Sequence, residues 1–204
     1  MCISLLVSLL GFIAPVQASL IINGSFENND VREGGWRWFE SSNVDGWQGG
    51  NIEIWDGLGG VEAFAGQQHA ELNAHPNNGE AFSIFQQFET EIGRTYDLSF
   101  AYQARRNNSE AFRVEVVGDD SLIDFVVDDH VRGIWSIFEH GFTANSSQTL
   151  LRFTSVFPES NTVGNFLDDV SVSAVIPLPA TAWLFLSAFL PLSLMRMIKP
   201  ASQA

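Results

Sequence analysis

The feature that most constrains the fold is the strict alternation of apolar and polar residues in short runs. In the segment 95–103, Tyr96, Leu98, Phe100 and Tyr102 occupy every second position. Successive side chains of a β-strand point to opposite faces, so a period of two is the pattern of a half-buried strand. The four residues are therefore predicted to face a core.

The same alternation recurs along the middle of the chain: Ile52 with Ile54, Phe112 with Val114 and Val116, and Leu151 with Phe153. Turn signals such as Asp45-Gly46 and Gly118-Asp119 separate these runs. No segment between residues 19 and 174 keeps a helical period for three turns. We therefore predict an all-β fold, one antiparallel jelly-roll β-sandwich over residues 19–174.

The N-terminal end carries an apolar run from Ile3 to Ala14, which is too short to span a bilayer comfortably. Small residues at Val16 and Ala18 then form a cleavage-like site. These features predict a signal peptide over residues 1–18 and export of the chain. No Lys or Arg precedes Arg32, so either the start codon is misassigned or the signal is weak.

The only cysteine of the chain, Cys2, lies inside this predicted signal peptide. The processed protein would then contain no cysteine. Disulfide bonds and thiol catalysis are therefore not expected in the mature domain.

The C-terminal end carries a second apolar run, from Ala182 to Met195, which Arg196 and Lys199 follow. Trp183 stands at its entry, where an indole favours the bilayer interface. The run predicts a transmembrane helix over residues 182–198.

A short motif precedes this helix, formed by Pro177, Leu178, Pro179 and Ala180. The motif, the apolar helix and the basic end together resemble the VPLPA variant of the PEP-CTERM sorting signals of bacteria. The resemblance implies that residues 175–181 are a sorting motif and linker, and that an exosortase processes the chain. It also implies transient anchoring in the inner membrane, then release to the envelope or extracellular matrix of a Gram-negative bacterium. The alternative is a plain C-terminal membrane anchor.

Charge is distributed unevenly along the chain. All 24 acidic residues but only eight of the ten basic ones lie in residues 19–174, which leaves that segment with a formal charge of −16. Such a field repels nucleic acid and anionic lipid, so no nucleic-acid partner is expected. It favours bound divalent cations, although an acidic surface also serves solubility alone.

Several short motifs occur in a fixed order along the predicted sandwich. They are Asn23–Glu27 at its start, Asp45–Trp47, Ala70–Ala74, Gly93–Phe100, and Phe166–Val172 at its end. Together they resemble the galactose-binding-domain-like jelly rolls of carbohydrate-binding modules. The resemblance implies eight or more strands, adjacent first and last strands, and a structural cation site near those two strands.

The candidate ligands of that cation are Glu27 and Asp168. Asp168 is expected to share a strand face with Phe166, Val170 and Val172. A carboxylate on an apolar face is costly unless it is paired or binds a metal ion. Two carboxylates with backbone carbonyls would suit Ca²⁺. The alternative is that Asp168 is exposed at the strand end or caps a turn.

The candidate ligand-binding residues are Trp36, Trp38, Arg105 and Arg106. Trp36 and Trp38 are two positions apart in a Gly-rich, polar segment, so both are expected to point the same way from a loop. Aromatic faces stack on the C–H surfaces of sugars, and arginines hydrogen-bond hydroxyl groups. For the arginine pair, the alternative is that it offsets surrounding carboxylates.

Catalysis is not predicted, because the chain has no Gly-x-Ser-x-Gly elbow and no His-Glu-x-x-His helix. His69, Glu71 and His75 could share a face around a metal, but isolated hydrogen-bonded or exposed histidines are the simpler expectation. Trp135 is expected in the core. The preferred function is a non-catalytic carbohydrate-binding or matrix-interaction module. The alternatives are a secreted hydrolase, glycoside or metal-assisted, and a purely structural matrix protein.

Overall fold

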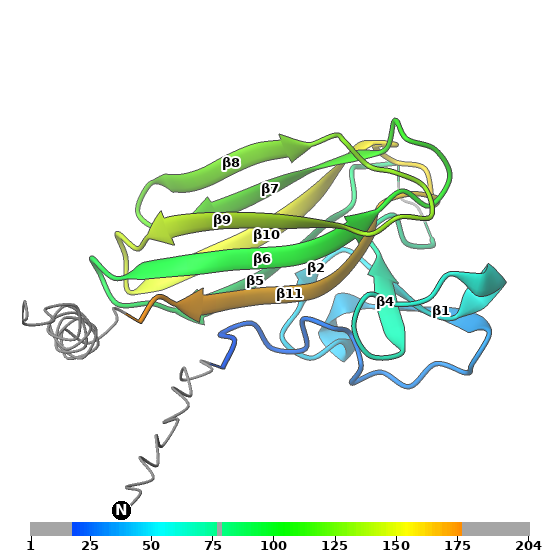
Figure 1. Ribbon diagram of the computed structural model, residues 1–204, viewed down its shortest axis with the longest axis horizontal. Helices are drawn as coiled ribbons and strands as arrows, with labels where there is room; N and C mark the ends of the chain where they lie inside the picture. The colour runs from blue at the N-terminus through cyan, green and yellow to red at the C-terminus, as the bar shows by residue number, and fades with distance from the viewer. Residues whose placement is uncertain (1–17, 77–78, 177–204) are drawn as a thin grey trace, which may run out of the picture. The chain divides into compact units, whose positions relative to one another are not determined.

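The computed structural model describes residues 18–76 and 79–176 (Figure 1). Residues 1–17 of the predicted signal peptide, the motif 177–180 and the predicted helix 182–198 lie outside these ranges. Among the described residues, no helix is long and apolar enough to cross a membrane. The chain divides into two units after Ala174, and the β-sandwich lies wholly in the first.

Eleven strands form two sheets in the described ranges. The six-stranded sheet consists, in spatial order, of β1 (Gly35–Phe39), β3 (Ile52–Asp56), β4 (Gln68–Glu71), β11 (Phe166–Ala174), β6 (Thr95–Gln103) and β9 (Ser136–Thr143). The five-stranded sheet consists of β2 (Gln48–Gly49), β5 (Ser83–Glu89), β10 (Gln148–Phe157), β7 (Ala111–Val117) and β8 (Ser121–Val127). Two single turns of 3₁₀ helix, η1 (Ser41–Asn43) and η2 (Leu58–Gly60), lie between β1 and β4.

Every pairing between these strands is antiparallel. The chain crosses between the two sheets repeatedly, so strands distant in sequence become neighbours, as β11 does between β4 and β6. The predicted all-β jelly-roll sandwich is confirmed.

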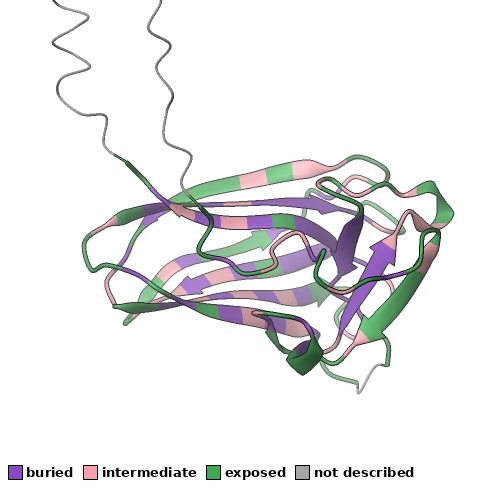
Figure 2. Cartoon of the chain, turned by 90° about the horizontal axis from the view of Figure 1, so that it is seen from below, coloured by how far each residue is buried: buried purple, intermediate pink, exposed green. Residues whose placement is uncertain are grey.

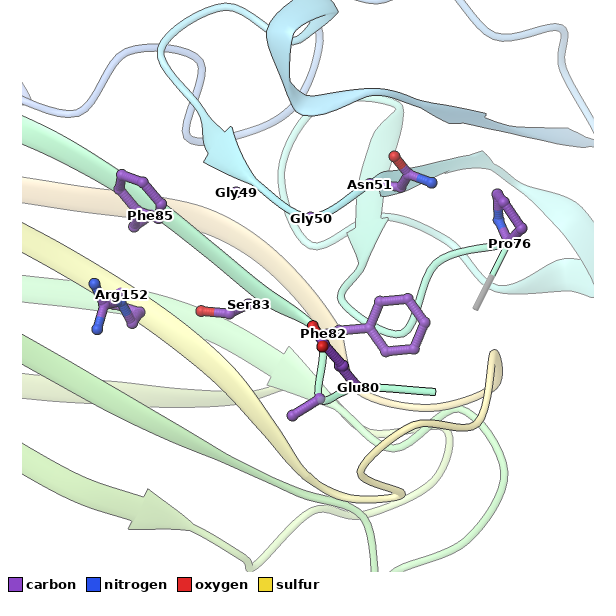
Figure 3. A pocket seen from close by; sticks show the side chains of 10 residues that line it. Gly49, Gly50, Asn51, Pro76, Glu80, Phe82, Ser83, Phe85 and Arg152 are labelled. Atoms are coloured by element: carbon purple, nitrogen blue, oxygen red, sulfur yellow. The ribbon is translucent and has the colours of Figure 1, made fainter. Parts of the chain in front are cut away.

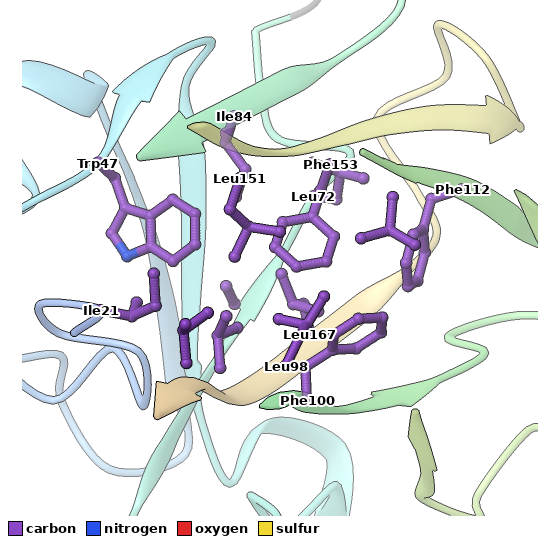
Figure 4. Close-up of a cluster of buried hydrophobic side chains, with 14 of the residues drawn as sticks. Ile21, Trp47, Leu72, Ile84, Leu98, Phe100, Phe112, Leu151, Phe153 and Leu167 are labelled. Carbon is purple, nitrogen blue, oxygen red and sulfur yellow. The ribbon is translucent and has the colours of Figure 1, made fainter. Parts of the chain in front are cut away.

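The core lies between the two sheets and is rich in phenylalanine (Figure 4). The face predicted from the alternation in β6 is buried, with Leu98 and Phe100 fully inaccessible. The ring of Phe100 lies 5.0 Å from that of Phe153 and 5.8 Å from that of Phe112, both in the opposite sheet. Alternating buried and exposed positions are visible along the strands in Figure 2.

The beginning of the domain lies beside its last strand. The amide of Leu20 donates to the carbonyl of Val172 at 2.7 Å, and the amide of Val170 donates to the carbonyl of Gly24 at 2.9 Å. The resemblance implied adjacent first and last strands, but the first strand, β1, pairs with β3 at the edge of the sheet. The segment that lies beside β11 is instead the irregular stretch before β1.

A bulge in β11 changes which residues face the core. The register of β11 on β6 shifts just after Asp168, and Asp169 adopts a positive φ of 48°. Val170 and Val172 therefore face the core, whereas Phe166 and Asp168 project from the outer face of the sheet. The prediction that all four residues share a face is wrong, because an extra residue at a bulge reverses the alternation.

Candidate functional site

Two exposed tryptophans stand on the outer face of the six-stranded sheet, on its edge strand β1. Trp36 is 45% exposed and Trp38 is 38% exposed. Two residues apart on a strand, their indoles project from the same face. The expected common direction is present, but the expected loop is wrong, because β1 pairs with β3 along its whole length.

Polar residues lie directly beside these indoles on the next strands. Trp36 is opposite Trp55 on β3, and Trp38 is opposite Glu53. Glu53 in turn is opposite Glu71 on β4. Directly opposite residues of antiparallel strands have Cβ atoms about 4.5–5.5 Å apart, so these side chains form one continuous row. The row leads from exposed aromatic rings to buried carboxylates.

Arg105 brings a guanidinium group to this row from the segment after β6. Its Nη1 lies 2.6 Å from both carboxylate oxygens of Glu71 and 4.0 Å from Oε1 of Glu53. Its guanidinium carbon lies 4.5 Å from the ring centroid of Trp55. The two groups therefore form a cation–π interaction. The side chain is 26% exposed, so part of the cation reaches solvent.

Within the described residues, every recorded polar contact of the Arg105 side chain runs through Nη1. The N–H groups of Nη2 and Nε remain available to donate hydrogen bonds to a ligand. A guanidinium presents five N–H donors in a fixed fork, so a ligand at this edge can still receive hydrogen bonds.

The two glutamates are held by the protein itself. Burial raises the pKa of Glu71 well above its usual value, and the nearby Arg105 lowers it in part. Oε1 of Glu71 also accepts the amide of Gly164 at 2.7 Å, and Oε1 of Glu53 accepts the indole N–H of Trp55 at 2.7 Å. Glu71 is fully buried and Glu53 almost so, so both carboxylates position the arginine and indole rather than face solvent.

Glu110 fixes the segment that carries Arg105. Its carboxylate accepts the backbone amides of Arg105, Arg106 and Asn107 at 2.7, 2.7 and 3.1 Å. Arg106 is exposed, and none of its recorded contacts in the described residues reaches the tryptophans. The structure therefore brings Trp36, Trp38 and Arg105 to one edge of the sheet and leaves Arg106 outside.

Asp168, the first predicted cation ligand, is fully buried on the outer face of β11. Its Oδ2 accepts the amides of Phe64 and Ala65 at 2.8 and 3.0 Å, and its Oδ1 accepts the amide of Asp169. Burial raises the pKa of Asp168 to about 7, although these three hydrogen bonds oppose the rise. A cation beside the group would favour its ionised form.

Glu27, the second predicted ligand, holds the other end of the same loop. Its Oε1 accepts the amides of Gln67 and Gln68, both at 2.8 Å. Gly66 lies between Ala65, which donates to Asp168, and Gln67, which donates to Glu27. It has φ +70°, and a Cβ at that position would meet the Glu27 carboxylate. The described residues contain no cluster of three or more metal-binding side chains. A cation at Glu27 and Asp168 would therefore require backbone carbonyls to complete its shell.

His69 is buried among aromatic rings on the outer face of the six-stranded sheet. Its ring centroid lies 4.7 Å from that of Phe166 and 5.5 Å from that of Trp135. Neither ring nitrogen has a hydrogen-bond partner in the described part of the chain. Burial lowers the pKa of His69 to about 4. Trp135 lies on this outer face rather than in the sandwich core, where it was expected.

His130 is a second buried histidine whose ring nitrogens lack a partner among the described residues. It packs against Tyr102 and Phe112, and burial lowers its pKa to about 4, opposed by nearby carboxylates. The expectation that isolated histidines are exposed or hydrogen-bonded is wrong for His69 and His130. His75, proposed to share a metal-binding face with His69 and Glu71, is exposed.

A pocket of about 610 Å³ lies elsewhere, on the outer face of the five-stranded sheet (Figure 3). Strands β2, β5 and β10 supply much of its wall, with the segments next to β2 and β5. The residues that give it chemical character are Gly49, Gly50, Asn51, Ser83, Phe85 and Arg152. Sequence reasoning did not single out this site, because its members come from three strands that only the fold brings together.

Solved structures with a similar fold were found by comparison. An arabinose-bound α-L-arabinofuranosidase, MgGH51, matches with a TM-score of 0.51 and 11% identity over 78% of this chain and 26% of that one. The structure of TmCBM61 in complex with β-1,4-galactotriose matches with a TM-score of 0.49 and 16% identity, covering 77% of this chain and 99% of that one. The first likeness shows a common fold.

Residues 19–173 match the family described as "Protein of unknown function (DUF642)". The chain belongs to this family. Halomucin from Haloquadratum walsbyi is 27% identical over 172 residues, which are 81% of this chain. The matched region spans 2% of the length of halomucin.

Proposed function

We propose that the domain is a non-catalytic polysaccharide-binding module whose binding edge consists of Trp36, Trp38 and Arg105. The observation that carries the proposal is the cross-strand row, in which exposed indoles lead directly to a partly exposed guanidinium. Aromatic rings of this kind stack on sugar rings, and the free N–H donors of an arginine orient hydroxyl groups. The arabinose-bound chain that shares the fold supports a sugar as the class of ligand.

A hydrolytic role for Glu53 and Glu71 is disfavoured by their surroundings. A general acid or base has to come within hydrogen-bond reach of the group that it protonates or deprotonates. Both carboxylates are covered, and their recorded hydrogen bonds go to Trp55, Arg105 and Gly164. Their role in the proposal is to hold Arg105 and Trp55 in place.

The test is affinity electrophoresis of the full chain in gels that contain galactan, xylan or β-glucan, compared with Trp36→Ala and Trp38→Ala variants. Retardation by at least one polymer, weakened about tenfold by either substitution, supports the proposal. Phe125→Ala is the matched control, since Phe125 is 55% exposed on β8, in the other sheet. Retardation that persists in both tryptophan variants contradicts the assigned edge. Release of reducing sugar from any polymer favours a hydrolase instead.

We also propose that the domain is exported and sorted to the cell envelope or extracellular matrix by an exosortase. The support is the sequence, with its predicted signal peptide at residues 1–18 and the motif Pro177-Leu178-Pro179-Ala180 before an apolar run. Replacement of the motif by Gly and Ser residues should leave an uncut, membrane-retained protein. An unchanged mature mass would contradict sorting by this motif.

A structural Ca²⁺ ion at Glu27 and Asp168 is a third proposal. Its support is that both carboxylates bind the backbone of the loop 64–68, and that burial disfavours the charge of Asp168. Bound Ca²⁺ would neutralise this charge and fix the loop. The proposed role is structural, because both carboxylates already accept backbone amides of the loop 64–68 and so hold it in place.

A further inference from the structure

We propose that the pocket of Phe85 and Arg152 on the five-stranded sheet is a second sugar-binding site, which makes the domain bivalent for polysaccharide chains. The inference rests on the proposed polysaccharide-binding function. It adds a separate site on the other sheet of the sandwich. Its volume, about 610 Å³, falls within the range of roughly 300–1,000 Å³ that is usual for small-ligand sites.

The chemistry of the pocket suits one or two sugar rings. Phe85 on β5 is half-buried and offers an aromatic face, and Arg152 is its direct neighbour on β10. The guanidinium carbon of Arg152 lies 5.6 Å from the ring centroid of Phe85. No ion pair of Arg152 is recorded within the described ranges, so its donors are available to hydroxyl oxygens. An aromatic face beside an arginine is the same combination as at Trp55 and Arg105.

Two glycines line the backbone side of this pocket. Gly49 has φ +103°, and a Cβ there would collide with the carbonyl oxygen of Ser83. The amide of Gly50 donates to that same oxygen at 2.7 Å, which closes β2 onto β5. The absence of a side chain at Gly49 therefore lets β2 lie close to β5, and Asn51 and Ser83 line the adjoining wall of the pocket (Figure 3).

The charge of the pocket indicates an uncharged sugar. Arg152 contributes a cation and Glu80 a carboxylate, while Asn51 and Ser83 are neutral hydrogen-bonding groups. The segment 19–174 as a whole carries a formal charge of −16. This field disfavours a polyanion such as a uronic-acid polymer. Neutral hexose or pentose units of a polysaccharide therefore fit the site better.

The two sites lie on different sheets, so each can hold its own stretch of polymer. Trp36 and Trp38 project from the six-stranded sheet, and Phe85 and Arg152 from the five-stranded sheet. A domain with two such sites links two polysaccharide chains, or binds one polymer surface more tightly than either site alone. Linked binding events typically strengthen overall binding by about 10²–10⁴-fold.

The experiment is titration calorimetry of the full chain with oligosaccharides. These are cut from the polymer, among galactan, xylan and β-glucan, that retards the chain in the gel. The unmodified chain should bind two equivalents. The Phe85→Ala/Arg152→Ala variant and the Trp36→Ala/Trp38→Ala variant should each bind one, and the fourfold variant none. Mixed with the intact polymer, the unmodified chain should raise turbidity at least tenfold more than either two-residue variant.

The matched control is Arg113→Ala. Arg113 lies on the same face of the sheet but is held by Asp124, with which it forms two hydrogen bonds of 2.6 Å. This variant should keep two equivalents. One equivalent for the unmodified chain, lost entirely in the tryptophan variant, would overturn the second site and leave the proposed function intact. Binding to none of the three polymers would overturn the proposed function and the second site with it.

Discussion

Nη1 of Arg105 lies 2.6 Å from both carboxylate oxygens of the fully buried Glu71. The pair joins β4 to the segment that follows β6, two parts of the chain that the strand ladders do not connect directly. It also fixes the guanidinium above Trp55. The stability of the domain and the shape of its proposed binding edge therefore depend on the same contact.

The first prediction concerns this contact. Arg105→Ala should lower the free energy of unfolding by about 3–5 kcal/mol, because removing one partner leaves a buried carboxylate uncompensated. Adding Glu71→Gln should recover much of that loss, since an amide needs no counter-charge. Urea denaturation of the three variants measures both effects. An Arg105→Ala variant as stable as the unmodified chain would show that the contact contributes nothing.

The second prediction is a loss of stability in mild acid from His69. Burial lowers its pKa to about 4 in the fold, against 6.5 for the free group. The fold therefore favours the neutral ring, so this contribution is complete above pH 6.5 and is lost as the pH falls towards 4. Its full size is about 3 kcal/mol. In thermal melts between pH 7 and 4, His69→Phe should flatten the acid slope, and an unchanged slope would argue against a buried neutral His69.

The third prediction concerns Asp168. Its contribution to stability depends on pH in the opposite direction to that of His69. Burial raises its pKa from 3.8 to about 7, so the fold favours the protonated acid. In the absence of metal, its contribution is complete below pH 3.8 and is lost as the pH rises through 7. Its full size is about 4 kcal/mol. In thermal melts in EDTA, the unmodified chain should lose stability between pH 5 and pH 8, and Asp168→Asn should lack this pH dependence.

Calcium should act on the same group and in the same pH range. The ion would bind the ionised carboxylate, so millimolar Ca²⁺ should raise the melting temperature at pH 8 more than at pH 5. Asp168→Asn should lose this response. Equal melting temperatures with Ca²⁺ and with EDTA at pH 8 would remove the cation proposal while leaving the fold untouched.

The fourth prediction concerns Gly66, where φ is +70° and a Cβ would meet the carboxylate of Glu27. Gly66→Ala should lower the free energy of unfolding by about 2–3 kcal/mol, since both backbone strain and a lost loop contact contribute. Gly133→Ala is the matched control, because Gly133 has φ +77° with open space around it. Equal losses of stability in the two variants would show that the contact between residue 66 and Glu27 does not contribute to the effect.

The core could be predicted from the sequence, because burial of Leu98 and Phe100 follows from the two-residue period alone. The outer face could not be predicted in the same way. Glu53 and Glu71 occupy positions that the alternation assigns to solvent, yet both are buried. Burial there depends on segments such as the one that brings Arg105 over β4, and no local pattern encodes that contact.

The predicted binding residues show the same limit. The common direction of Trp36 and Trp38 follows from their spacing, but their proximity to Glu53 depends on the register between β1 and β3. The failure at Asp168 has a single cause, the bulge at Asp169. The bulge reverses which side chains of β11 face inward beyond Asp169. The order of apolar and polar residues in the sequence does not show where such a bulge occurs.

The hydrogen bonds between Leu20 and Val172, and between Gly24 and Val170, also have a mechanical consequence. The N-terminal segment runs antiparallel to β11 there, so the two ends of the sandwich lie side by side. A pulling force applied between these ends loads the bonds one after another, as in opening a zipper, instead of shearing them together. The domain should therefore yield at low force when it is stretched from end to end.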